Sequence, residues 1–136
     1  MRVKIIGNGN WGTALGKLLL ENGHDISYWQ NNEIIDNTEI ILLVVPTQAL
    51  RSVLPKIVTK DLIIINCAKG IENTTHKLPF QIVEEILGKT NYFSLIGPSF
   101  ADEVKGEMPT LVNLGFRDEE SVEQVKKLFQ TPRKPL

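Results

Sequence analysis

A glycine turn near the start of the chain most constrains its fold. Residues 1–6 form a strand-like apolar run, and Gly7, Gly9 and Gly12 follow with the spacing G-x-G-x-x-G, directly before a helix-like run. In a dinucleotide-binding strand–turn–helix unit, the first glycine makes the tight turn and the second lets the backbone approach a pyrophosphate. The third lets the helix pack close to the strand. We therefore predict that these glycines bind a dinucleotide at the N-terminus of a helix.

Strand-like and helix-like runs alternate along the rest of the chain. Short runs rich in Ile, Val and aromatic residues predict strands at 3–6, 26–29, 39–45, 62–66, 92–96 and 110–114. Helical spacing of apolar residues predicts helices at 11–22, 48–54, 78–87 and 121–129. This alternation predicts βαβ units and an α/β fold of the Rossmann type, with a doubly wound, mainly parallel sheet. We expect one dinucleotide-binding domain over residues 1–130 and a tail at 131–136.

The connection at residues 30–38 is unusually short for such a fold. Its nine residues span about 30 Å when extended, which is enough to recross the sheet. They leave room for one helical turn at 33–36, but they cannot hold a helix, a strand and a second helix. The usual third strand is therefore predicted to be shortened or missing, with the strand at 26–29 at the sheet edge.

Composition excludes several functional classes. The net charge is −1, so we expect no binding to nucleic acid. No apolar run approaches the ~18 residues that a membrane span needs. The single cysteine, Cys67, cannot form an internal disulfide and fits a cytoplasmic protein, where it is predicted to be a core residue. His24 and His76 are far apart and lack ligand-spaced partners, so we expect no metal site.

Several candidate site residues follow the predicted strands, because ligands of open α/β sheets bind beyond the carboxyl ends of the strands. Beside the glycines, Asn10 either bonds a phosphate or caps the helix, and Trp11 covers either the cofactor or the core. After the strand at 26–29 stand Gln30, Asn31 and Asn32, with neither the acid that would bind a ribose 2′-hydroxyl nor the arginine that would suit a 2′-phosphate. The sequence therefore leaves NAD and NADP open as cofactors.

The next two strand ends offer further candidates. Pro46 and Thr47 either flank the nicotinamide or pyrophosphate, or only begin a helix. Lys69 either offers a positive charge to a substrate oxygen or phosphate, or is a solvated surface group. Ser99 follows a Gly-Pro turn and is a good helix N-cap, with Asp102 in the capping-box position.

Five motifs occur together, and their order resembles the N-terminal domain of bacterial NAD(P)-dependent glycerol-3-phosphate dehydrogenase. They begin at Gly7, Val44, Lys69, Gly97 and Gly106, and read Gly-x-Gly-x-Trp-Gly-Thr-Ala, Val-Val-Pro-Thr-x-Ala-Leu-Arg, Lys-Gly-Ile-Glu, Gly-Pro-Ser-Phe-Ala-x-Glu-Val and Gly-x-x-Pro-Thr. The resemblance covers about residues 2–129. It implies reversible hydride transfer between a nicotinamide and the C2 carbon of glycerol 3-phosphate or dihydroxyacetone phosphate, a step in making glycerophospholipid precursors.

The resemblance also implies roles for individual residues. Asn10, Trp11 and Ala101 would contact the cofactor, Gly97 and Ser99 the substrate, and Lys69 both. Asn31 and Asn32 stand near the position where the family often has a basic or histidine residue beside the ribose phosphate. The region after the second predicted strand is shorter than the family pattern by about thirty residues.

The chain is expected to lack the family's helical C-terminal domain, which supplies the lysine that acts as general base. Without a positioned base, hydride transfer would lose about 10²–10⁴-fold in rate. We therefore expect a cofactor-binding domain with little activity alone. The alternatives are a split enzyme completed by a separate chain and a degenerate dinucleotide-binding or interaction module without turnover. Exposed apolar surface also allows self-association.

Overall fold

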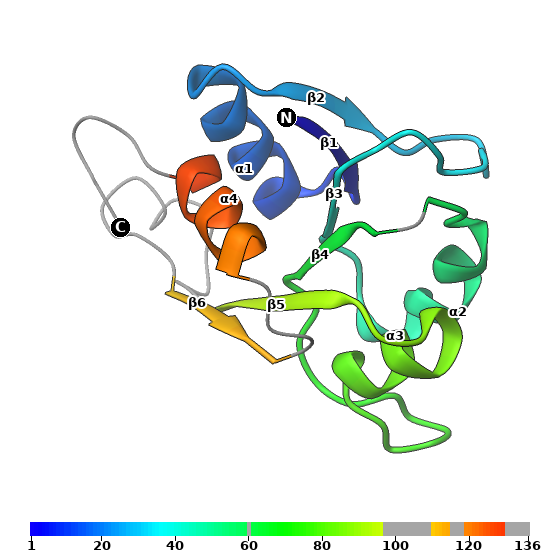
Figure 1. Ribbon diagram of the computed structural model, residues 1–136. Helices are drawn as coiled ribbons and strands as arrows, with labels where there is room; N and C mark the ends of the chain where they lie inside the picture. The colour runs from blue at the N-terminus through cyan, green and yellow to red at the C-terminus, as the bar shows by residue number, and fades with distance from the viewer. Residues whose placement is uncertain (60, 97–109, 115–118, 130–136) are drawn as a thin grey trace.

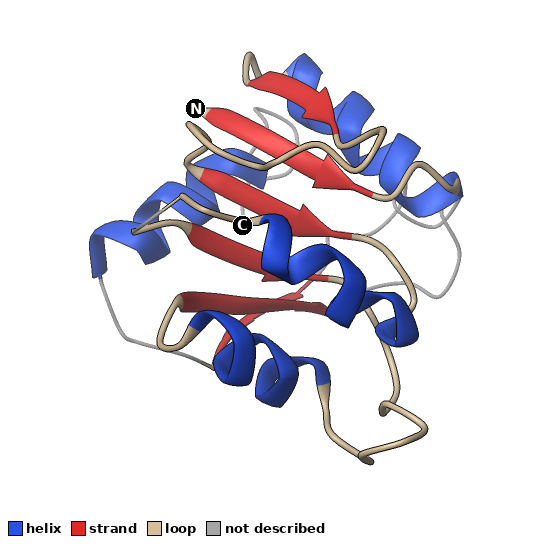
Figure 2. Ribbon diagram, turned by 90° about the vertical axis from the view of Figure 1, so that its right-hand side faces the viewer, coloured by secondary structure: helices blue, strands red, loops and turns tan. Residues whose placement is uncertain are grey.

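The structure is a computed structural model, and it describes residues 1–59, 61–96, 110–114 and 119–129. These residues form a single sheet with helices on both faces (Figures 1 and 2). Its strands are β1 (Arg2–Ile6), β2 (Asp25–Tyr28), β3 (Ile40–Leu43), β4 (Ile63–Asn66), β5 (Asn91–Ile96) and β6 (Thr110–Asn113). They lie in the order β2-β1-β3-β4-β5-β6, and only the β5–β6 pair is antiparallel. The predicted mainly parallel Rossmann-type sheet is confirmed.

Helices cover the sheet on both sides. They are α1 (Asn10–Glu21), α2 (Leu50–Val53), α3 (Pro79–Leu87) and α4 (Glu119–Phe129). Buried residues of α1 and α4 pack on one face of the sheet, and those of α2 and α3 pack on the other. The central strands β3 and β4 are buried at every position because helices cover both of their faces. None of the helices in the described part of the chain has the length and apolar character of a membrane-spanning segment.

Helix α1 ends in a Schellman motif. Gly23 adopts φ +84° and donates its N–H to the carbonyl of Leu20, while His24 donates to Leu19. The side chain of Asn22 donates to the carbonyl of Leu128 at 3.0 Å. The end of α1 is thereby joined to the end of α4.

The helix predicted at 48–54 is divided into three short pieces. A 3-10 turn at Thr47–Ala49 precedes α2, and a second at Leu54–Lys56 follows it. Pro55 lies in the second turn and has no N–H to continue an α-helix.

The short connection after β2 recrosses the sheet without a helix. The helical turn for which the connection has room at 33–36 is not formed, and Ile35 instead pairs with Ile57 in an isolated parallel bridge. Ile35 is fully buried there. Strand β2 is the first strand of the sheet, as predicted, and its outer edge has no neighbour among the described residues.

The strands β1 and β2 carry polar side chains on the face that α1 does not cover. Ile26 and Tyr28 pack against the α1 side, whereas Asp25 and Ser27 of β2 are exposed. On β1, Lys4 lies between buried residues and is partly exposed. These side chains are compatible with water and would be costly under a helix. The sequence of these strands therefore suits the short connection.

We expect the central strand to dominate stability. Leu42 is fully buried in β3, and Leu42→Ala should lower the free energy of unfolding by about 2–5 kcal/mol because it leaves a cavity. Leu20 is 59% exposed on α1, and Leu20→Ala should change it by less than about 0.5 kcal/mol. Urea denaturation measures both, and equal losses would contradict this description of the core.

Candidate functional site at the carboxyl edge of the sheet

The strands β1, β3 and β4 end in one row, and β5 crosses the same row two residues before its own end. Ile6 of β1 pairs with Leu43 of β3, which pairs with Asn66 of β4, which pairs with Ser94 of β5. The segments that follow these residues therefore start from the same edge of the sheet. Adjacent parallel strands bring loops that are distant in the sequence together, and this edge is where open α/β sheets bind ligands.

The glycine turn is held by two close backbone approaches. Gly7 adopts φ +116°, and a Cβ added there would lie 2.1 Å from the carbonyl oxygen of Val44. A Cβ at Gly12 would lie 2.3 Å from the carbonyl oxygen of Gly7. Both positions therefore require glycine: Gly7 so that β1 can approach the end of β3, and Gly12 so that α1 can begin against the turn.

Gly9 is different, because its surroundings are open. A Cβ at Gly9 would have no atom within 4 Å. Gly9 is the N-cap of α1 and provides no side-chain hydrogen bond to the helix. The first N–H groups of a helix lack partners inside the helix and carry its positive partial charge. The residues present therefore fit a pyrophosphate above Gly9, in space that a side chain would occupy.

The two side chains beside the glycines face different surroundings. Asn10 is exposed at the first position of α1. Trp11 is partly buried and packs against the core on the α1 side, which includes Cys67. Burial raises the pKa of the Cys67 thiol to about 12, with the Trp11 side chain and the charge of Lys69 opposing the shift. Cys67 is therefore a protonated core residue, as predicted, and Trp11 covers it.

The segment after β2 is a tight turn. Glu33 donates its N–H to the carbonyl of Gln30, and Asn31 and Asn32 between them have φ of 56° and 52°. Positive φ at both central positions is the pattern of a type I′ turn, and asparagine tolerates it better than most residues. Both asparagines are exposed. The carboxylate of Glu33, the next residue in the sequence, forms an ion pair with Lys4 at 3.1 Å.

The loops after β3 and β4 are joined by a buried hydroxyl. Pro46 is exposed at the N-cap of the first 3-10 turn. Next to it, Thr47 is 2% exposed, and its hydroxyl donates to the carbonyl of Lys69 at 2.8 Å. Lys69 is itself exposed, and no carboxylate of the described residues forms an ion pair with it. Its charge is therefore available at the edge.

The loop that carries Lys69 is shaped by the last residue of β4. Asn66 is 2% exposed, donates to the carbonyl of Ala68 at 3.0 Å and accepts from the N–H of Ala68 at 3.1 Å. In the sequence this asparagine was placed only at the end of the strand predicted at 62–66. A polar residue that ends a run of isoleucines on a buried strand is the signal that could have identified it.

An ion-pair network that was not predicted from the sequence links the Lys69 loop to α2 and α3. Arg51 of α2 forms ion pairs with Glu72 of the loop and Glu85 of α3, and Lys77 also binds Glu85. Hydrogen bonds from Arg51 and Lys77 hold the pKa of Glu85 at about 2. Hydrogen bonds from Arg51 and Thr75 lower the pKa of Glu72. The network joins α2, α3 and the loop.

The remaining predicted site residues, Gly97, Ser99 and Ala101, lie outside the described residues, as does the predicted capping residue Asp102. They follow β5 in the sequence, and β5 runs parallel to β4.

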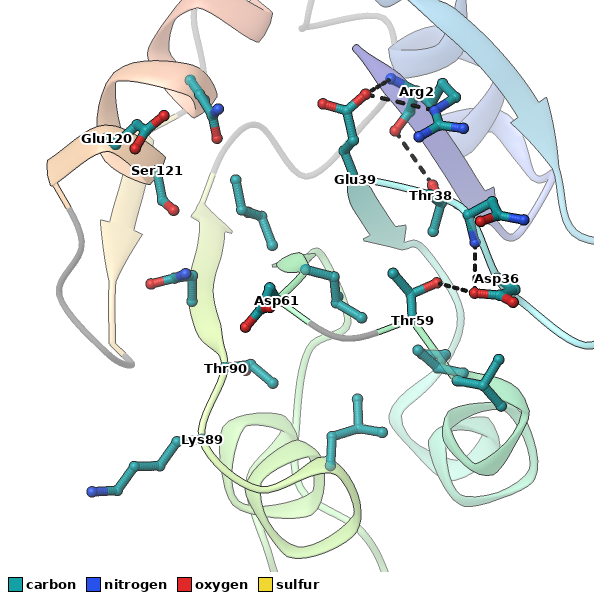
Figure 3. Close-up of a pocket in the computed structure, with 18 of the residues that line it drawn as sticks. Arg2, Asp36, Thr38, Glu39, Thr59, Asp61, Lys89, Thr90, Glu120 and Ser121 are labelled. Atoms are coloured by element: carbon teal, nitrogen blue, oxygen red, sulfur yellow. Dashed lines mark hydrogen bonds and ion pairs between the residues drawn. The ribbon is translucent and has the colours of Figure 1, made fainter.

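A polar hollow of about 1180 Å³ lies at the opposite, amino edge of the sheet (Figure 3). Arg2 pairs with Glu39 there, and Thr59 donates to Asp36 at 3.4 Å. The hollow contains none of the predicted site residues. In the described ranges, no group of three or more His, Cys, Asp or Glu residues is arranged to hold a metal ion.

The chain is similar in sequence to proteins of a known family. The family model described as "NAD-dependent glycerol-3-phosphate dehydrogenase N-terminus" matches residues 2–38 and 30–122. The chain belongs to this family. Similar proteins include glycerol-3-phosphate dehydrogenase [NAD(P)+] of Shouchella clausii, 33% identical over 94% of this chain and 49% of that protein. The enzyme of the same name from Fusobacterium nucleatum is 32% identical over 97% of this chain and 51% of that protein. The chain thus spans about half the length of these curated relatives.

The alignments with relatives contain residues that this chain does not have. The alignment with the Shouchella clausii protein is 168 residues long, although this chain has 136, so the relative carries residues that this chain lacks. The two stretches matched by the family model meet at residues 30–38. This is the connection between β2 and β3, where sequence analysis predicted the shortening.

Solved structures share the fold. Glycerol-3-phosphate dehydrogenase from Coxiella burnetii superposes with a TM-score of 0.74 at 21% identity, over 97% of this chain and 51% of that one. A 1-pyrroline-5-carboxylate reductase from Streptococcus pyogenes gives 0.69 at 20% identity, over 95% and 54%. At these identities the likeness concerns the fold alone.

The ion-pair network predicts a specific acid sensitivity. The folded-state pKa of Glu85 is depressed from 4.5 to about 2. Its contribution to stability is therefore present above pH 4.5 and is lost as the pH falls toward about 2. Between pH 4.5 and 2, the unfolding free energy of the wild-type chain should decrease more steeply than that of Glu85→Gln. Parallel urea midpoints across this range for the two proteins would contradict the assignment.

Proposed function

We propose that this chain is the NAD(P)-binding domain of a glycerol-3-phosphate dehydrogenase, with residues 1–130 forming the domain. The observation that carries the proposal is the open space above Gly9 at the N-terminus of α1, between two glycines that the backbone requires. Family membership and the loops that meet at the carboxyl edge support it.

The proposed ligand contacts follow the strand ends. Gly7, Gly9 and Gly12 hold the pyrophosphate, the turn after β2 faces the adenosine ribose, and Pro46 and Lys69 face the nicotinamide. The full set proposed for the cofactor is Gly7, Gly9, Asn10, Trp11, Gly12, Asn31, Asn32, Pro46, Lys69 and Ala101. For the substrate, glycerol 3-phosphate or dihydroxyacetone phosphate, it is Lys69, Gly97 and Ser99.

A bound nicotinamide would supply the hydride donor or acceptor for the proposed reaction. The chain's own part is to bind and orient: the glycine turn fixes the pyrophosphate, and Lys69 places a positive charge beside a substrate oxygen. We propose that turnover also requires a general base from a helical domain, in the same protein or in a separate chain, and that this chain has little activity without it.

Blocking the space above Gly9 tests the proposal. Gly9→Val should leave the fold intact, because no atom lies within 4 Å of the added Cβ. It should abolish binding of NADH up to millimolar concentration, whereas Leu20→Ala should bind as wild type does. Calorimetric titration with NADH measures this, and circular dichroism checks the fold. Undiminished binding by Gly9→Val would mean that the pyrophosphate does not lie there.

The turn after β2 suggests little preference between NAD and NADP. Asn31 and Asn32 are neutral, and the carboxylate of Glu33 is paired with Lys4. We expect similar dissociation constants for NADH and NADPH. Asn31→Asp, which still tolerates positive φ, should weaken NADPH about tenfold relative to NADH, because a carboxylate repels the 2′-phosphate. A ratio unchanged by this substitution would place the ribose elsewhere.

A further inference from the structure

The loop that follows β4 is attached to the segment after β3 at several points. Thr47 donates its hydroxyl to the carbonyl of Lys69. Gln48 donates to the carbonyl of Ile71 at 2.9 Å and accepts the N–H of Asn73 at 3.0 Å. The backbone around Lys69 is thus bonded to the first 3-10 turn on both sides of Gly70, although Lys69 and Ile71 are exposed.

Glu72, three residues after Lys69, anchors the same loop. Its carboxylate is buried, with 6% of the side chain exposed, and both oxygens accept from the Nε of Arg51, at 2.9 and 2.7 Å. The hydroxyl of Thr75 also donates to this carboxylate. The backbone of Glu72 closes the loop, because its N–H donates to Lys77 and its carbonyl accepts from His76, each at 2.8 Å.

These hydrogen bonds hold the carboxylate of Glu72 in one position. A buried carboxylate is tolerated only when it is paired and hydrogen-bonded, so its partners determine where the loop lies. Arg51 is held in turn by Glu85 of α3 and is only 34% exposed. Lys69 lies three residues before Glu72, within the part of the loop that these bonds enclose.

We propose that Glu72 and Arg51 are positioning residues for Lys69: their ion pair holds the loop so that the Lys69 ammonium group stays at the cofactor and substrate edge. This inference rests on the proposed function. It assigns to the Glu of the Lys-Gly-Ile-Glu segment a task distinct from ligand contact, because its side chain is directed at α2 and is buried.

A double-mutant cycle on the whole chain tests the inference, with NADH affinity as the readout. Glu72→Gln keeps the shape but removes the charge, and it should raise the NADH dissociation constant about 3- to 10-fold. Lys69→Met should raise it as well. In the Lys69→Met background, Glu72→Gln should have no further effect, because it acts through Lys69. Effects that multiply, or no effect of either single variant, would overturn the inference.

Controls separate positioning from a general loss of stability. Arg51→Lys keeps the charge but not the contact of Nε with both oxygens of Glu72. Its NADH dissociation constant should therefore lie between those of the wild type and Arg51→Met. Glu123→Gln makes the same chemical change in an exposed ion pair, with Lys126 on α4 at 3.8 Å, and should leave NADH affinity unchanged. Amide hydrogen exchange should accelerate in residues 67–77 of Glu72→Gln and not in β1 or β3. Uniform acceleration would overturn the inference.

If Glu72→Gln does not fold, the same cycle with Arg51→Met and Lys69→Met decides the question. Failure of the wild-type chain to bind NADH overturns the proposed function and this inference with it. NADH binding by the wild type without coupling to Lys69 overturns this inference alone.

Discussion

The approach of Gly7 to the backbone of Val44 is the contact on which the rest of the structure depends. A side chain at Gly7 would collide with the Val44 carbonyl, and one at Gly12 would collide with Gly7 itself. With both glycines present, β1 and β3 can end side by side and α1 can begin directly above them. The same arrangement leaves the space above Gly9 open, so the packing that builds the sheet also creates the space in which we propose that a pyrophosphate binds.

The short connection after β2 shows how a Rossmann-type sheet tolerates a missing segment. Ile35 of this connection pairs with Ile57 and is fully buried in the core on the α2 and α3 side. On the face of β1 and β2 that α1 does not cover, Asp25 and Ser27 are exposed and Lys4 is partly exposed. The local sequence and the shortened topology therefore agree, which is what a uniquely folded chain requires.

Much of this could be predicted from the sequence because the signals are local. Apolar runs and glycine spacing located the strands, the main helices and the glycine turn, and the length of the connection placed β2 at an edge. The helical turn that the sequence allowed at 33–36 does not form, because a long-range pairing of Ile35 with Ile57 prevails over local propensity. Asn66 and Glu72 were not singled out as structural residues, because burial and partners distant in the sequence define their roles.

The sequence by itself determined the fold class, the glycine turn and the candidate residues at the strand ends, since each depends on neighbours within a few positions along the chain. Only the tertiary structure decided which candidates are held together. The hydroxyl of Thr47 reaches the backbone of Lys69, and Arg51 reaches Glu72, across 21 or more residues of sequence. Such contacts arise because parallel strands bring distant loops to one edge, and a linear pattern contains no record of which side chains will meet there.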